Sequence, residues 1–169
     1  MKKNKITLFL ALISLLLIGC AHEKYGEYSV QAINTQTGIS AGMSKTGELL
    51  VLVRDDDRQA IYIPNNRFGE VEIFNCPEAP VMYVKVNLVG KKGCSILKIE
   101  LPAKGTDLKY YRHKEVGKMI SWKGKKAWIV DLKEASSNGK TLRVTFDVEN
   151  DRKRRTGNYN PVSNIITAE

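Results

Sequence analysis

The side chains with obvious chemical potential are few and widely separated in the chain. The triplet Asp55-Asp56-Asp57 could offer carboxylate oxygens to Ca²⁺, but consecutive side chains on an extended segment alternate in direction, and no glycine follows to bend a ligand loop. His113 sits among cations, and only Glu115 is placed to orient it as a general base. We therefore expect a solvated turn at 55–57, a surface histidine, and no catalytic residue, metal site or cofactor.

Three clusters of basic residues are better candidates for a functional surface. They are Lys91-Lys92, the segment 123–126 and the run 152–155. If the first two clusters lie in turns at one end of the fold, they form a cationic rim near Trp122 that suits phosphate or carboxylate groups. The alternative is that lysine-rich turns only keep the protein soluble and protect its sheet edges. Arginine pairs with carboxylates in bidentate geometry, so the last cluster is the strongest, and the candidate binding residues are Lys123, Lys125, Lys126, Arg152, Lys153, Arg154 and Arg155.

The first twenty residues have the pattern of a bacterial secretion signal. A short cationic start at 2–5 precedes the almost wholly apolar run 6–18. This run is shorter than the roughly 20 residues that a membrane-spanning helix needs, which favours a cleaved signal over a permanent span. Leu17-Ile18-Gly19-Cys20 closes the segment and resembles the lipobox of bacterial lipoproteins.

The resemblance covers residues 1–21 and implies a lipid anchor. It implies removal of residues 1–19, transfer of a diacylglycerol to the Cys20 thiol and acylation of the freed amine. Two or more acyl chains hold a protein stably on its membrane. In enterobacterial lipoproteins an aspartate after the cysteine favours the inner membrane, so Ala21 implies the outer membrane, with the domain facing the periplasm. The inner membrane and the cell surface stay open as alternatives.

The mature chain has the length of one domain and an excess of positive charge. Removing 19 of the 169 residues leaves 150, enough to bury most of the unfolded surface without further help. The signal contains three lysines and no acid, so the formal charge of +9 falls to +6. Such a domain is attracted to anionic membrane surfaces, lipopolysaccharide phosphates or acidic protein faces. Nucleic acid is not expected as a partner in the periplasm.

The remaining pattern is that of short strands separated by polar turns. Met82, Val84, Val86 and Leu88 alternate with polar or aromatic neighbours, and the segment 142–148 alternates in the same way. About eight to nine such strands predict an all-β fold, a small immunoglobulin-like or related β-sandwich. We expect a lipidated cysteine and tether at 20–26, the sandwich at 27–149 and a basic C-terminal segment at 150–169. That last segment is either a frayed tail or a final edge strand.

Cys76 and Cys94 are the two thiols that remain if Cys20 is lipidated. Isolated cysteine pairs in an oxidising periplasm usually form a disulfide, and we predict one here. A simple meander of strands at 70–76, 81–89 and 94–101 argues against it, because that arrangement places the two thiols at opposite ends of the sheet. Either the bridge forms and the meander is wrong, or the meander holds and the thiols stay apart.

Three classes of function fit these features. The first is a membrane-anchored protein-binding module, either an accessory of an envelope machine or an immunity-type inhibitor of a toxin. The second is a binder of anionic envelope glycans or lipids, such as lipopolysaccharide or peptidoglycan. The third is a periplasmic enzyme, which would need a pocket built from His113 or from acids such as Glu70 and Glu72. No nucleophile motif, phosphate loop or metal-ligand spacing occurs in the sequence, so the first class is favoured.

Overall fold

The computed structural model describes residues 27–63, 70–87, 90 and 92–168. The predicted signal peptide, the lipidation site at Cys20 and the tether lie outside these residues. Within the described part of the chain, no helix is long and apolar enough to cross a bilayer.

The described chain contains thirteen antiparallel strands in three sheets and one short 3₁₀ helix, η1 (Leu108–Tyr110). The first sheet has the order β1 (Tyr28–Asn34), β2 (Ile39–Ser44), β3 (Leu49–Arg54), β4 (Asp57–Tyr62). The second has the order β5 (Val71–Cys76), β6 (Val81–Asn87), β7 (Cys94–Glu100), β8 (Arg112–Val116). The third has the order β13 (Ile165–Ala168), β12 (Arg155–Asn160), β11 (Leu142–Val148), β10 (Lys125–Ala135), β9 (Ile120–Trp122).

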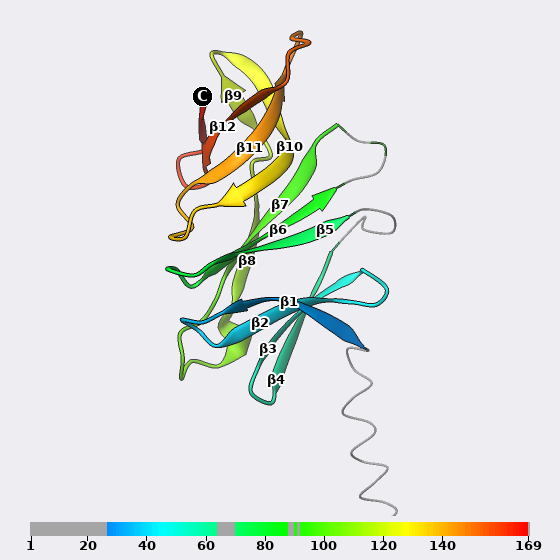
Figure 1. The fold of residues 1–169 in the computed structure, drawn as a ribbon, viewed down its shortest axis with the longest axis vertical. Coiled ribbons are helices and arrows are strands. Elements are labelled where there is room, and N and C mark those ends of the chain that lie inside the picture. Colours follow the sequence, from blue (N-terminus) through cyan, green and yellow to red (C-terminus); the bar gives the residue numbers. More distant parts are fainter. Residues whose placement is uncertain (1–26, 64–69, 88–89, 91, 169) are drawn as a thin grey trace, which may run out of the picture.

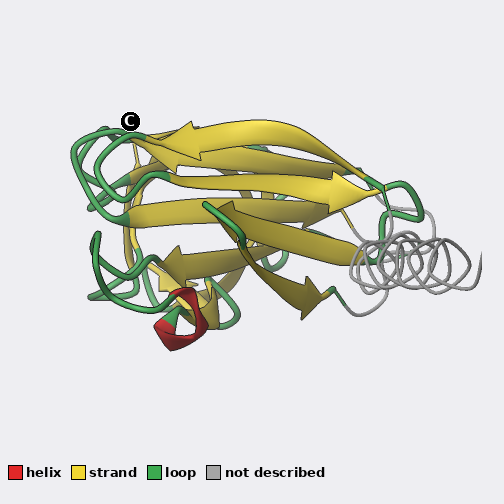
Figure 2. Ribbon diagram, turned by 90° about the horizontal axis from the view of Figure 1, so that it is seen from below, coloured by secondary structure: helices red, strands yellow, loops and turns green. Residues whose placement is uncertain are grey.

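The three sheets are stacked, with the second in the middle (Figure 1). One apolar core lies between the first and second sheets, and another lies between the second and third and inside the third. Seen from below, the strands form successive layers and the 3₁₀ helix lies at their margin (Figure 2). The predicted all-β, sandwich-like fold is confirmed, and it is built from three sheets.

Each face of the middle sheet packs in a different apolar core. Met82, Val84 and Val86 of β6 pack in the core with the first sheet, as their alternation predicts. The opposite face of β6 is also buried, because Tyr83 lies in the core with the third sheet and Lys85 is only 6% exposed. A strand buried on both faces is usual when sheets cover it from both sides.

A buried asparagine joins the first sheet to the second. The Asn34 amide, which is fully buried, donates to Asn75 Oδ1 at 3.1 Å and to the carbonyl oxygens of Cys76 and Ala79 at 3.2 and 2.9 Å. Its own oxygen accepts from the backbone N–H and the hydroxyl of Thr37. Every polar atom of this side chain is therefore bonded, which is the condition for burying it without a large penalty.

The third sheet curls so that its two edge strands approach each other. β13 contacts β9, and the Asn164 amide donates to the Met119 carbonyl oxygen at 2.7 Å. Because β12 and β13 complete this sheet, residues 155–168 belong to the fold, and β13 is its last edge strand. The strand number exceeds the expected eight to nine partly because β12 is rich in residues of low β-propensity.

The predicted disulfide between Cys76 and Cys94 is absent, and both thiols are free. Cys76 pairs with Val81 at one end of β6, and Cys94 pairs with Asn87 at the other end. Six residues of strand separate these positions, which is about 20 Å at 3.3 Å per residue, whereas bridged Cα atoms lie within about 7 Å. The meander is therefore present, and the bridge prediction is wrong for the geometric reason that the meander implies.

Candidate functional site

A broad groove of about 1340 Å³ opens where β10 and β11 of the third sheet meet β6 of the second. Three segments line it together with these strands: the turn before β7, the residue before β5 and the loop between β11 and β12. The lining residues are Glu70, Lys85, Asn87, Lys92, Gly93, Trp128, Val130, Asp131, Lys133, Thr145, Asp147, Val148, Asn150, Asp151, Arg152 and Arg154.

A bulge in β10 creates part of this lining. Ile129 and Leu132 lie in the core, so regular alternation from Ile129 would also point Asp131 inward. The register shifts between Ile129 and Asp131, and as a result Val130 and Asp131 both line the groove. Bulges commonly redirect a side chain in this way. The charged cluster on this wall therefore depends on one extra residue in β10.

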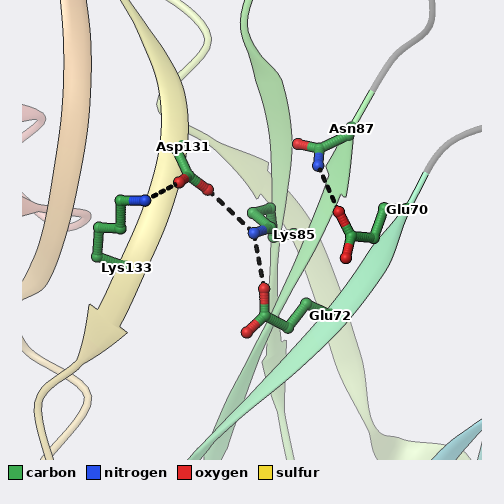
Figure 3. Close-up of polar contacts among 6 residues, drawn as sticks. All are labelled: Glu70, Glu72, Lys85, Asn87, Asp131 and Lys133. Carbon is green, nitrogen blue, oxygen red and sulfur yellow. Dashed lines mark hydrogen bonds and ion pairs between the residues drawn. The ribbon is translucent and has the colours of Figure 1, made fainter.

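Lys85 lies at the centre of that cluster, between two carboxylates from different sheets (Figure 3). Its Nζ is 2.6 Å from Glu72 Oε2 and 3.0 Å from Asp131 Oδ1. Asp131 also pairs with Lys133 at 2.5 Å, and beside them the Asn87 amide donates to Glu70 at 3.4 Å. Only Lys85 is deeply buried: its side chain is 8% exposed, against 51% for Glu72 and 28% for Asp131.

Burial and pairing act in opposite directions on these groups. Burial alone would lower the pKa of Lys85, but the hydrogen bonds and charges of Glu72 and Asp131 outweigh it and raise that pKa above its usual value. Burial would likewise raise the pKa of Asp131, and the two neighbouring lysines lower it instead. Lys85 and Asp131 are therefore both charged at neutral pH, and their ion pair joins the second sheet to the third.

Two of the predicted basic clusters meet around Trp122 at one end of the third sheet. Lys123 Nζ lies 4.7 Å and Arg155 Cζ 4.6 Å from the centre of the Trp122 ring, as expected for cation–π contacts. Arg155 also pairs with Asp151 at 2.6 Å, and its side chain is only 26% exposed. Lys125 at the start of β10 contributes to lowering the pKa of Asp151, after the Lys153 backbone N–H and Arg155. Arg155 thus has a structural role in addition to its charge.

The other cations of the run 152–155 are more available. Arg154 forms a fork-shaped pair with Asp147, with nitrogen–oxygen distances of 3.1 and 3.3 Å, and its side chain is 64% exposed. Arg152 and Lys153 are exposed, and neither pairs with a carboxylate of a described residue. From the adjacent turn, Lys92 Nζ lies 5.7 Å from the centre of the Trp128 ring.

We call this region the basic end. It comprises Lys92, Lys123, Lys125, Lys126, Arg152, Lys153, Arg154 and Arg155. Three carboxylates, Asp147, Glu149 and Asp151, lie among these eight cations, which gives the basic end a net charge of +5. That is nearly all of the +6 carried by residues 20–169. The three basic clusters do therefore gather at one end, except that Lys91 lies outside the described residues.

The sequence did not single out Lys85, Asp131 or Trp128. Lys85 stands at a position that suits either a solvated or a buried face, and Asp131 reaches the groove only through the bulge. One usable signal was present: Trp128 and Val130 alternate with core residues on β10, which places an aromatic and an aliphatic side chain on the opposite face.

The other residues considered for chemistry lie away from the groove. Asp55 and Asp56 form the turn between β3 and β4, and Asp57 begins β4, paired in register with Arg54. His113 is exposed on the edge strand β8 and stacks on Tyr111 at 5.9 Å between ring centres. Among the described residues, no group of three or more His, Cys, Asp and Glu side chains is arranged to hold a metal ion.

Comparison with known proteins adds no relative. No protein-family model, curated protein or solved structure matches the chain.

Proposed function

We propose that this protein is a lipid-anchored module that binds another protein through the basic end and the adjoining groove. The supporting observation is the gathering of nearly all the net charge of the mature chain at one end of the third sheet. Charge concentrated in this way accelerates encounter with a partner of opposite charge and orients it. The partner is an envelope-machine component or a periplasmic toxin with an acidic face.

The groove favours a protein over a polyanionic glycan or lipid as the ligand. Beside the cations it carries Glu70, Asp131, Asp147 and Asp151, so it presents charges of both signs. A protein surface matches such a pattern with carboxylates and amines in register, whereas a surface of phosphates alone offers no positive group to pair with these carboxylates. Binding of anionic envelope glycans or lipids is the alternative that the same experiment detects.

The proposed anchor is the lipidated Cys20, with the domain on the periplasmic side of the outer membrane. Replacing Cys20 with alanine is expected to abolish incorporation of labelled palmitate and to release the protein from the membrane fraction. Retention of both properties in the Cys20→Ala variant would exclude lipidation at this residue.

In-cell crosslinking of the tagged full chain in its native host, followed by mass spectrometry, tests the binding role. The charge-removing variant is Arg152→Ala with Lys153→Ala, since neither side chain forms an ion pair within the described structure. Lys140→Ala is the matched control, an exposed lysine in the turn at the other end of β10 and β11. We expect one stoichiometric protein partner, lost in the double variant and kept in the control.

Two further results complete that test. The purified partner should bind the full chain directly, and the affinity should fall as salt is raised, because exposed charges are screened within about 10 Å at 0.1 M ionic strength. Capture of lipopolysaccharide or peptidoglycan alone would overturn the proposal of a protein partner and favour the alternative, binding of anionic envelope glycans or lipids.

A further inference from the structure

The groove contains a buried hydrogen-bond donor without an acceptor. Among the described residues, nothing accepts a hydrogen bond from Trp128 Nε1, although that atom is buried. Buried indole N–H groups usually find a partner, and an orphaned one calls for an explanation such as a bound group. The Trp128 side chain lines the groove next to the basic end, and its Nε1 lies beneath the surface there.

The surroundings of this donor carry positive charge. Lys92 Nζ lies over the Trp128 ring, and Arg152 lines the same groove without an ion-pair partner among the described residues. The carboxylates of the lining are largely neutralised internally: Asp131 by Lys85 and Lys133, and Asp147 and Asp151 by neighbouring arginines. An N–H donor with nearby unpaired cations suits an anionic oxygen.

We infer that the groove receives a carboxylate of the partner protein, held by Trp128 Nε1 and by the charges of Lys92 and Arg152. This inference rests on the proposed function and specifies the chemistry that the partner presents. A carboxylate fits better than a phosphate. A phosphate monoester carries a charge of about −1.5 to −2, so the part of the Asp147 and Asp151 charge that their arginines leave uncompensated opposes it more strongly than it opposes a single negative charge.

Gly93, the residue before β7, packs against the indole of Trp128. A Cβ atom built on Gly93 would lie 2.6 Å from the Ile129 carbonyl oxygen and 3.4 Å from Trp128 Cδ1, the ring carbon next to Nε1. The backbone of Gly93 therefore lies directly against the indole, and only glycine permits this approach, also because its φ is +94°. Because Nε1 is buried, the exposed Lys92 side chain that lies over the ring must move aside to admit the carboxylate oxygen.

The indole ¹H–¹⁵N resonance of Trp128 reports on this bond directly. The chain has two tryptophans, and Trp122 does not line the groove. The purified full chain in detergent would be titrated with an acetylated, amidated peptide of alternating glutamate and glycine. Three probes serve for comparison. They are the same peptide with every glutamate replaced by glutamine, that glutamine peptide with a free C-terminal carboxylate, and inorganic phosphate. Trp128→Phe assigns the resonance, and Trp122→Phe is the matched control.

We expect the Trp128 resonance to move downfield with the glutamate peptide and to stay fixed with its glutamine counterpart. A response to the glutamine peptide with the free terminus would identify a chain end as a second source of the carboxylate. Arg152→Ala, Lys92→Ala and Trp128→Phe should each weaken glutamate-peptide binding by roughly 10- to 100-fold, as expected for loss of a charge-assisted contact. Lys140→Ala should leave it unchanged.

The inference fails if the resonance does not move at saturating glutamate peptide, if both uncharged and charged peptides move it equally, or if phosphate moves it more. Because Arg152 and Lys92 are exposed, their alanine variants keep the test valid even if Trp128→Phe does not fold. Capture of a partner that depends on the basic end, together with a fixed Trp128 resonance, would overturn this inference and leave the proposed function standing. If no partner depends on the basic end and the Trp128 resonance also stays fixed, the proposed function and this inference are both overturned.

Discussion

Removing the two carboxylates around Lys85 is expected to destabilise the protein far more than the two single replacements together. In Glu72→Gln, Lys85 keeps Asp131 at 3.0 Å, and in Asp131→Asn it keeps Glu72 at 2.6 Å. Each single change leaves the buried charge with one partner, so each should lower the free energy of unfolding by only about 1 kcal/mol. The double variant leaves an ammonium with 8% exposure and no carboxylate, which costs about 3–5 kcal/mol.

Urea denaturation of the full chain in detergent, followed by tryptophan fluorescence, measures these differences. The loss of about 3–5 kcal/mol expected for the double variant lowers the melting temperature by roughly 10 °C in a domain of this length. Lys85→Met should cost about 1 kcal/mol or less, since the carboxylates it leaves are partly exposed. Glu27→Gln is the control, because Glu27 and Lys45 are 74% and 76% exposed and such pairs contribute less than about 1 kcal/mol. Additive single effects, or a Lys85→Met variant as unstable as the double variant, would refute the buried-charge explanation.

Three further predictions concern stability, thiol chemistry and pH. Asn34→Ala should lower the free energy of unfolding by about 3 kcal/mol in a urea titration, because it leaves several buried partners of the amide unbonded; a change below 1 kcal/mol would contradict this. Burial raises the pKa of the Cys76 and Cys94 thiols to about 11, so both should resist alkylation in the folded protein and titrate as two free thiols in urea; finding none would mean that a disulfide exists. The lowered pKa of Asp131 means that its contribution is present above the unfolded pKa of about 3.9 and is lost as pH falls through the folded pKa. The stability difference between the native chain and Asp131→Asn should therefore be constant from neutral pH down to about pH 5 and shrink below about pH 4.

The strands of the middle sheet follow from local pattern, but the number of layers does not. The alternation of Met82, Val84 and Val86 is sufficient to predict a strand and one of its buried faces. The opposite face carries Tyr83 and Lys85, which are equally compatible with solvent. Whether that face is buried depends on Glu72 and Asp131 being present to pair with the lysine, and these come from other strands. The residue pattern of β6 alone therefore could not predict that a third sheet covers its opposite face.

The pairing register of the strands explains two further features that the sequence did not predict: the position of Asp131 and the separation of the two thiols. Trp128 and Val130 are assigned correctly to one face of β10 by alternation alone. Asp131 lies on the same face as Trp128 and Val130 only because the strand bulges, and the residues 127–132 carry no pattern that predicts the bulge. The disulfide was predicted from compartment statistics, whereas the pairing of β5, β6 and β7 determines the distance between the thiols. Statistics about a residue pair do not outweigh a register that separates it.

The run 152–155 shows why four consecutive cations need not have one role. Arg155 is fixed between Asp151 and the Trp122 ring, so replacing it perturbs the end of the third sheet as well as the charge. Arg154 is held by Asp147, and a partner's carboxylate would have to compete with that pair. Arg152 and Lys153 form no ion pair within the described structure and are exposed. Replacing all four residues together would therefore confound binding with stability, whereas the pair at 152 and 153 changes the charge presented to a partner and leaves the contacts around Trp122 in place.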